Sequence, residues 1–166
     1  AASLQSLLPS LAQEPLPAFS TKARQVYLVE QATGTVLLAI NENQAFPAAS
    51  LAKLMTMEVV FDALDKGQIQ PDTVYPVTEY AWRTGGAPSG TTTMFAALKS
   101  QVPVTDLVKG VVVQNANDAC IILAEGLAKS ETEFAARMTA RARDLGLTRS
   151  TFGNATGLPS AQSWTT

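Results

Sequence analysis

The strand-forming residues of this chain are concentrated in one stretch, residues 25–43, with the sequence QVYLVEQATGTVLLAINEN. Two β-rich runs flank a short link that contains Gly34, so the stretch predicts a β-hairpin. Two strands alone are only marginally stable in water. Nothing after Gly157 reads as the further strands that a sheet packed against helices needs. We therefore expect the hairpin to belong to a larger sheet, most of which lies outside this chain.

The remaining periodic segments predict helices. The first follows the turn FPAAS and stops at Lys66-Gly67, a second starts near Thr105, and a third covers NDACIILAEGLAKS, with Asn117 or Asp118 as its cap. A fourth begins at Ser130, which forms a capping box with Glu133, and ends at Gly146. The apolar positions expected to be buried are Leu51, Leu54, Met55, Val59 and Leu64 in the first helix and Phe134, Met138 and Leu145 in the fourth.

Residues 68–99 contain too many Pro and Gly residues for a long periodic element. Within them, RTGGAPSGTTT (residues 83–93) is a polar, Gly-rich loop that does not match the phosphate-binding pattern GxxxxGK[ST]. Two interpretations remain open for this loop: it is solvated, or it borders an active site.

Composition excludes several classes of function. The chain has 166 residues, of which 46% are apolar, and a net charge of −2 without a basic run, which argues for one globular domain and against nucleic-acid or anionic-lipid binding. It has no histidine and one cysteine, Cys120, so it contains no Ser-His or Cys-His catalytic system, no histidine metal site and no internal disulfide. Cys120 is expected to be a buried helical thiol. No apolar run has the length of a membrane span.

Ser50 and Lys53, at the start of the first helix, form the candidate catalytic pair. Their spacing places both side chains on one helix face, so the amine reaches the hydroxyl. The helix N-terminus and the four apolar neighbours, Leu51, Ala52, Leu54 and Met55, are both expected to lower the pKa of Lys53. A neutral amine next to a hydroxyl is a competent general base, and N–H groups at the same helix end would hold an oxyanion. The structural alternatives are an N-cap role for Ser50 and a solvated Lys53.

Several motifs resemble one enzyme family. ASLAKLMT (residues 49–56) looks like the Ser-x-x-Lys nucleophile motif of the serine penicillin-recognising enzymes, and VVVQNANDACIILAE (residues 111–125) looks like their Ser-x-Asn motif. YAWRTGGAPSGTTTMF (residues 80–95) and FGNATGLP (residues 152–159) resemble segments of the low-molecular-mass penicillin-binding proteins, which are D-alanyl-D-alanine carboxypeptidases. The resemblance runs from about Thr21 to Pro159, with the motifs in the family's order.

The resemblance implies an α/β (α+β) protein with the β-lactamase/transpeptidase-like fold, in which an antiparallel sheet has flanking helices and a helical subdomain. Residues 1–20 would be an N-terminal tail, left after removal of a signal peptide, and residues 21–166 the N-terminal part of the catalytic domain. Ser50 would be the nucleophile, Lys53 the base, and Asn117 the asparagine that contacts the substrate. The substrates would be peptidoglycan stem peptides, and β-lactams would acylate Ser50. No metal or organic cofactor is implied, and the location would be the periplasm or cell envelope.

The sequence departs from the family pattern in two places. Asn115 stands where the family usually has the serine of its second motif, and an amide donates a hydrogen bond but does not relay a proton as a hydroxyl does. As a structural alternative, Asn115 and Asn117 simply cap the following helix. The third motif, Lys-Thr-Gly, which binds the substrate carboxylate in the family, does not occur. Like the missing strands, it would lie outside this chain.

Three functional hypotheses follow. The first is a D-alanyl-D-alanine carboxypeptidase, with weak or no turnover in the absence of the third motif. The second is a non-catalytic relative that binds peptidoglycan or a protein partner, which Asn115 motivates. The third, ranked lower, is a β-lactamase. The resemblance also leaves open an attachment to the membrane through a C-terminal region outside this chain.

Overall fold

The computed structural model describes residues 19–166, which divide into two compact units between residues 42 and 43. In the first unit, β1 (Val26–Val29) pairs with β2 (Val36–Ile40) in antiparallel fashion, with Val26 opposite Ile40. The prediction of a hairpin is therefore confirmed. The predicted tail, residues 1–20, lies almost entirely outside the described residues, so the assignment of a tail and of a catalytic domain from residue 21 stays a prediction.

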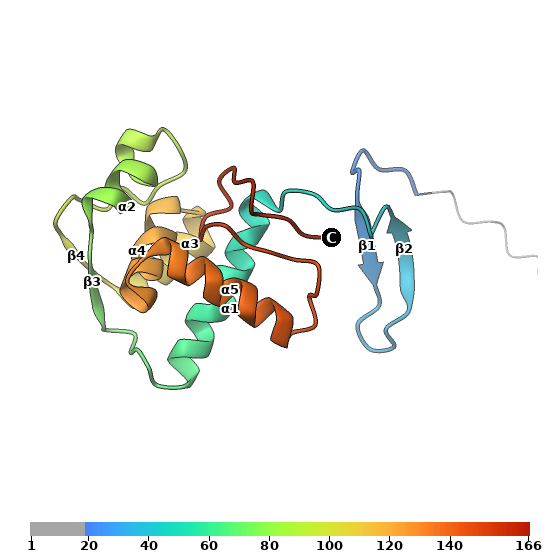
Figure 1. Cartoon of the computed structure of the whole chain (residues 1–166), viewed down its shortest axis with the longest axis horizontal. Helices are drawn as coiled ribbons and strands as arrows, with labels where there is room; N and C mark the ends of the chain where they lie inside the picture. Colours follow the sequence, from blue (N-terminus) through green and yellow to red (C-terminus); the bar gives the residue numbers. More distant parts are fainter. Residues whose placement is uncertain (1–18) are drawn as a thin grey trace, which may run out of the picture. The chain divides into compact units, whose positions relative to one another are not determined.

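The second unit is mostly helical, as the periodicity predicts (Figure 1). Side chains from most of its elements pack into one hydrophobic core. The two shortest helices, η1 and η2, are 3₁₀ turns. In chain order the elements are η1 (Ala49–Leu51), α1 (Ala52–Asp65), β3 (Val74–Pro76), α2 (Glu79–Thr84), η2 (Ala87–Ser89), β4 (Gln101–Pro103), α3 (Val104–Gln114), α4 (Asn117–Ala128) and α5 (Glu131–Asp144).

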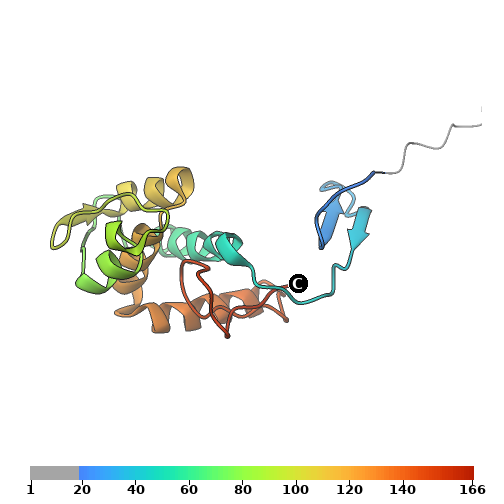
Figure 2. The ribbon, with the colours of Figure 1, turned by 90° about the horizontal axis from the view of Figure 1, so that it is seen from above.

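Helix α4 forms the centre of this unit and contacts α1, α2, α3, α5 and β3. Every residue from Ala119 to Ala124 is fully buried, which explains why this helix is apolar on all sides. Cys120 is one of these residues, so the prediction of a buried helical thiol is confirmed. In Figures 1 and 2, α5 runs beside α1, and Phe134 and Met138 of α5 are fully buried.

Three expectations about helix faces and caps are wrong. Leu51 and Leu54 are 60% and 72% exposed, because α1 buries the opposite stripe, which includes Lys53 and Thr56. Leu145 lies beyond the end of α5 and is exposed, since the chain turns there toward Gly146. The N-cap of α4 is Ala116, so neither Asn117 nor Asp118 occupies the cap position.

The caps of α5 and α1 agree better with the prediction. The Ser130 hydroxyl accepts a hydrogen bond from the Glu133 amide at 3.1 Å, which is one half of the predicted capping box. Helix α1 ends at Asp65, followed by Gly67 with a positive φ of 65°, as the Lys66-Gly67 stop predicts.

A second two-stranded sheet was not predicted. Strands β3 and β4 pair in antiparallel fashion at the edge of the helical unit, with Tyr75 opposite Val102 (Figure 1). Each has only three residues, and Pro76 and Pro103 occupy them, so the sequence shows no strand pattern there. Residues 68–99 thus hold short elements, β3, α2 and η2, in place of one long element.

The last segment, residues 145–166, contains no helix or strand, but it is firmly attached. The backbones of Thr151 and Trp164 exchange two hydrogen bonds, and Phe46 and Thr165 do the same. The pair at Phe46 brings the segment back to the residues that precede η1 and α1. As a result, two parts of the sequence that are more than a hundred residues apart meet at Ser50.

Candidate active site

Ser50 is exposed on η1, immediately before α1. The residue before it, Ala49, has a φ of 48°, a conformation that L-residues other than Asn and Asp rarely adopt. Behind this turn lies Gly157, with a φ of 78°, where a Cβ atom would overlap the Ala49 carbonyl oxygen. The serine is therefore presented on a strained turn, and only glycine fits against the back of that turn.

Lys53 lies on α1 one turn after Ser50 and is only 6% exposed. Its Nζ is 3.3 Å from Ser50 Oγ and donates a hydrogen bond to the Thr156 carbonyl at 2.8 Å. Burial lowers the pKa of Lys53. A thiolate at Cys120 would oppose this effect, but burial raises the pKa of that thiol to about 12, so it is neutral near pH 7. The amine next to the Ser50 hydroxyl is thus less basic than that of an ordinary lysine.

The burial of Lys53 agrees only in part with the prediction from its apolar neighbours. Ala52 and Met55 are buried as well, whereas Leu51 and Leu54 are exposed. The Thr156 carbonyl, which binds the amine, belongs to residues 154–158, which we call the Lys53-binding turn. Asn154 organises this turn: its Oδ1 accepts from the Gly157 amide at 2.7 Å, and its Nδ2 donates to the Leu158 carbonyl at 2.9 Å.

The Lys53-binding turn is also attached to α1 directly. The Thr56 hydroxyl, which is fully buried, donates to the Ala155 carbonyl at 2.7 Å. Lys53 and Thr56 are three residues apart on one face of α1, so they bind the carbonyls of two successive residues, Thr156 and Ala155. Sequence reasoning missed Thr56, Thr156 and Gly157 as site residues. The compact turn sequence Asn-Ala-Thr-Gly was the available signal.

Asn115 completes the group around the serine. It ends α3 in the left-handed conformation, with a φ of 56°, and its Nδ2 lies 3.4 Å from Ser50 Oγ. Asparagine is one of the residues that tolerate this conformation best, so the backbone at the end of α3 suits it. Its side chain does not cap α4, and that alternative is wrong.

Asn117 is bound to the Gly-rich loop. It is 5% exposed, its Nδ2 donates to Thr91 Oγ1 at 3.0 Å, and its backbone amide donates to the Thr92 carbonyl at 2.8 Å. Its Oδ1 is the one buried side-chain oxygen or nitrogen without a partner among the described residues. An acceptor in this state has an unused capacity for a donor. The capping alternative is wrong for Asn117 as well.

The Gly-rich loop, residues 83–93, is not simply solvated. Gly85, Gly86 and Thr93 are buried, and Thr91 binds Asn117. Asp118, which is fully buried, accepts a hydrogen bond from Thr93 Oγ1 in this loop. It also accepts from the amides of Met94 and Ala96, which follow the loop. The loop therefore borders the residues of the second motif. This agrees with the interpretation that the loop borders the candidate active site.

A groove of about 360 Å³ opens at the hydroxyl of Ser50. Its walls are mostly apolar, and among the described residues the Ser50 backbone amide donates to no acceptor. The groove is lined by Ser50, Leu51, Lys53, Leu54, Met57, Val111, Val112 and Asn115.

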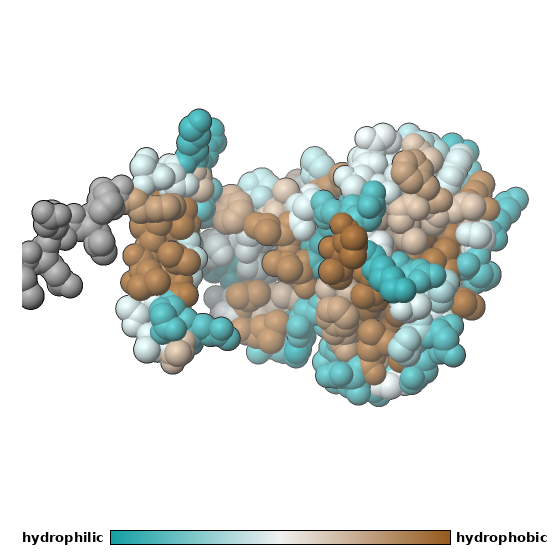
Figure 3. Space-filling view, turned by 180° about the vertical axis from the view of Figure 1, so that it is seen from behind, coloured by the Kyte–Doolittle hydropathy of each residue, from teal (hydrophilic) through white to brown (hydrophobic). Residues whose placement is uncertain are grey.

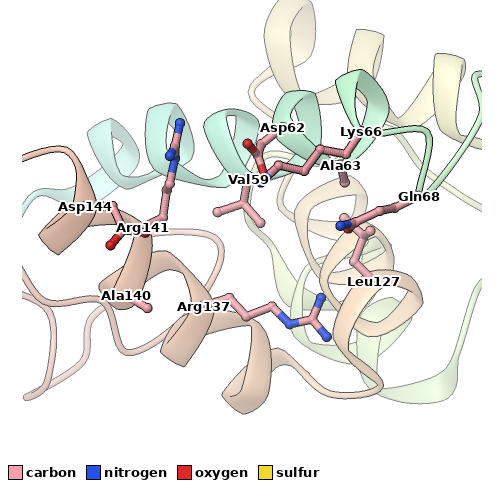
Figure 4. A pocket seen from close by; sticks show the side chains of 10 residues that line it. All are labelled: Val59, Asp62, Ala63, Lys66, Gln68, Leu127, Arg137, Ala140, Arg141 and Asp144. Carbon is pink, nitrogen blue, oxygen red and sulfur yellow. The ribbon is translucent and has the colours of Figure 1, made fainter.

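A separate pocket of about 260 Å³ lies between α1 and α5 (Figure 4). Two of its cations are already paired: Lys66 with Asp62 at 2.7 Å, and Arg141 with Glu58 at 2.6 Å. It shares no residue with the groove at Ser50. Ser50, Lys53 and Asn115 line the groove and not this pocket.

Residues 19–166 contain neither a cluster of potential metal ligands nor a helix able to span a membrane. No group of three or more His, Cys, Asp or Glu side chains in this part of the chain is placed to hold a metal ion. Within the same residues, no helix combines the length and apolar character needed to cross a membrane.

Comparison with known proteins gives consistent results. The model of a family described as D-alanyl-D-alanine carboxypeptidase matches residues 10–166. The D-alanyl-D-alanine carboxypeptidase DacC of Escherichia coli is 40% identical over 148 residues, which are 89% of this chain and 37% of that protein. The crystal structure of penicillin binding protein 5 from Haemophilus influenzae superposes with a TM-score of 0.84 at 31% identity, over 92% of this chain and 44% of that one. Penicillin-Binding Protein D2 from Listeria monocytogenes, in its cefotaxime-bound form, gives a TM-score of 0.77 at 26% identity, over 90% of this chain and 59% of that one.

These matches confirm the predicted fold: the chain contains part of the β-lactamase/transpeptidase fold. The chain spans 37% of the length of the Escherichia coli protein, and 44% and 59% of the two crystallised chains.

Proposed function

The chain belongs to the family of D-alanyl-D-alanine carboxypeptidases, and on this premise we propose that the full protein is a serine-type D-alanyl-D-alanine carboxypeptidase. The observation that carries the proposal is the pairing of an exposed hydroxyl with a buried amine. Ser50 Oγ is open to the groove, and Lys53 Nζ, 3.3 Å away, is 6% exposed with a lowered pKa.

The first chemical step uses this pair. The neutral amine of Lys53 takes the proton of the Ser50 hydroxyl while Oγ attacks the carbonyl carbon of the terminal D-Ala–D-Ala bond. The Thr156 carbonyl accepts one N–H of the Lys53 amine at 2.8 Å. The nitrogen lone pair of Lys53 is then directed to the proton of the Ser50 hydroxyl. The free backbone N–H of Ser50 stabilises the negative oxygen of the tetrahedral intermediate.

The second step releases D-alanine. As the C–N bond breaks, the leaving amine takes a proton, and the Lys53 ammonium is the donor that the site offers. Asn115 Nδ2 lies 3.4 Å from Ser50 Oγ, where it orients the hydroxyl, but an amide does not relay the proton. Water then attacks the ester at Ser50, with Lys53 again as base. Asn117 is assigned to the substrate amide, because its buried Oδ1 has no other partner.

The substrate class, ligands and location belong to the same proposal. We assign peptidoglycan stem peptides as substrates and β-lactams as acylating ligands; the cefotaxime-bound form of the Listeria protein supports the second assignment. The site then lies in the periplasm or cell envelope, where these peptides are, and a membrane attachment would come from a region beyond this chain. Residues 21–166 would be the N-terminal part of the catalytic domain.

The test is acylation of the full-length protein by a fluorescent β-lactam. We expect stoichiometric labelling that is lost in Ser50→Ala and strongly slowed in Lys53→Met, together with release of D-alanine from a stem peptide that ends in D-Ala–D-Ala. Equal labelling of the parent protein and Ser50→Ala would exclude Ser50 as the nucleophile.

One alternative is favoured by a specific observation, the asparagine at position 115. If the protein only binds peptidoglycan or a partner, the parent would release no D-alanine, whereas Asn115→Ser would gain turnover. Release by the parent protein excludes this alternative. Rapid hydrolysis of the antibiotic by the parent would instead favour a β-lactamase.

A further inference from the structure

Glu131, the first residue of α5, is a carboxylate that the chemistry above does not use. It is only 7% exposed, and among the described residues it forms no ion pair with a cation. Burial of an unpaired carboxylate is costly unless hydrogen bonds compensate for the lost water. Glu131 has two such bonds, and they come from different parts of the unit. Oε2 accepts from the Tyr80 hydroxyl on α2 at 2.6 Å, and Oε1 accepts from the Ala155 amide at 2.9 Å.

The second of these bonds leads to the catalytic pair. Ala155 belongs to the Lys53-binding turn, and both of its backbone polar groups are held by buried side chains: the N–H by Glu131 and the carbonyl by Thr56. The next carbonyl in the turn, that of Thr156, accepts the hydrogen bond of Lys53. A shift of Ala155 therefore moves the Thr156 carbonyl, which among residues 19–166 is the one acceptor of the Lys53 amine besides Ser50 Oγ.

We propose that Glu131 is a positioning residue for the reaction of Ser50 and Lys53. Its carboxylate holds the Lys53-binding turn in place, and the turn keeps the Lys53 amine shielded from water and directed toward Ser50 Oγ. The inference rests on the proposed function of these two residues. It extends the site from the groove to a buried carboxylate that has no contact with the substrate.

The neighbouring carboxylate, Glu125 on α4, supplies a matched control. It is half-buried, accepts a hydrogen bond from the Thr78 hydroxyl at 2.7 Å, and has a pKa raised mainly by burial, with a contribution from Glu131. It makes no bond to the turn. The titratable groups that face Glu131 are thus Tyr80 from α2, whose pKa rises to about 12 through its bond to Glu131, and Glu125 and Cys120 from α4. The one that faces Lys53 is Cys120.

The geometry also predicts which substitution is tolerated. The Ala155 N–H needs an acceptor, and a glutamine at position 131 offers an oxygen of the same reach, while its amide donates to Tyr80. In Glu131→Ala, Ala155 keeps only one of the two side chains that bind it, Thr56, and water reaches Lys53. Since burial is what lowers the pKa of this amine, that pKa then rises toward the ordinary lysine value.

The experiment measures the rate of acylation by a fluorescent β-lactam as a function of pH in the full-length protein and its variants. We expect the midpoint of the rising limb to move up by at least about one pH unit in Glu131→Ala, which means about tenfold slower acylation at a fixed pH below both midpoints. Glu131→Gln and Glu125→Gln should keep the parent midpoint. A merely structural role would lower the folded fraction, and hence the amplitude, without moving the midpoint.

Each result separates this inference from the function on which it rests. If the parent is labelled and a folded Glu131→Ala variant keeps the parent midpoint, the role of Glu131 is overturned, while the proposed function stands. An equal shift in Glu131→Ala and Glu125→Gln also overturns it, because the effect would then be that of any buried charge. A parent that is not labelled overturns both proposals. If Glu131→Ala does not fold, Glu131→Asp, which withdraws the carboxylate by one methylene group, replaces it with the same criteria.

Discussion

Helix α4 and the β1–β2 hairpin are both rich in apolar residues, but they bury them very differently. From Ala119 to Ala124, every residue of α4 is fully buried, whereas Tyr27, Leu28 and Leu37 of the hairpin are 62%, 51% and 60% exposed. In Figure 3, brown, apolar side chains gather on the hairpin, at the left of the view. The helical unit thus has a core of its own, and the site is built on it. Within its own unit, the described residues form only a two-stranded sheet, which is marginally stable by itself.

The largest effect should come from the core of the helical unit. Phe134 of α5 is fully buried, so Phe134→Ala is expected to lower the free energy of unfolding by about 3–5 kcal/mol. Phe95→Ala removes the same side chain at a position that is 71% exposed and should cost far less. Chemical denaturation of both variants measures the difference. Equal losses would contradict the assignment of the core.

Two glycines sharpen the comparison between the units. Gly34 of the hairpin and Gly157 of the Lys53-binding turn have nearly the same φ, 72° and 78°, but only Gly157 has backbone atoms where a Cβ would lie. Gly34→Ala should cost about 1–2 kcal/mol from the dihedral alone. Gly157→Ala adds the overlap with Ala49 and should cost about 2–4 kcal/mol. It should also abolish acylation at Ser50, whereas Gly34→Ala should not; the same rate of labelling in both would argue against a closed turn behind Ser50.

The third prediction concerns pH. The pKa of Lys53 is lower in the folded protein than its ordinary value of 10.5, so between these two values the unfolded chain binds more protons. Stability therefore gains a contribution as pH rises through this window, and this contribution is absent below the folded pKa. Lys53→Met should flatten the rise, as measured by denaturation at a series of pH values. Lys22→Met, an exposed position in the hairpin unit, controls for the loss of a positive charge.

The smallest effect is expected in the hairpin. Leu28→Ser replaces a half-exposed side chain and should change the stability of this chain by no more than about 0.5 kcal/mol. The same substitution in the full-length protein is the informative counterpart. A loss of the size expected for Phe134→Ala there would show that another part of the protein covers this face.

Much of this architecture could be predicted from local sequence. The hairpin, the end of α1 at Gly67 and the start of α5 at Ser130 depend on turn and capping residues that act within a few positions. The buried face of α1 could not be predicted in this way. Lys53 and Thr56 are polar, and they are buried only because carbonyls of Thr156 and Ala155 satisfy them from the far end of the sequence.

The candidate site shows the same division. Ser50, Lys53 and Asn115 were identified from short motifs, and the structure brings them together. The same motifs gave no signal for Glu131, because its role depends on a contact with Ala155, 24 positions later. A glutamate at the start of a helix is an ordinary helix-forming residue, and only its burial marks it.

The bond between Lys53 and Thr156 joins residues 103 positions apart, and this separation sets an order of events during synthesis. A nascent chain emerges from the ribosome with its N-terminal part first. Until residues 154–158 have followed, Lys53 has no carbonyl to bind and remains in contact with water as an ordinary ammonium group. The proposed nucleophile thus emerges in an inert state. It gains its base only when residues 154–158 have packed against α1, so an unfolded chain has no activated serine.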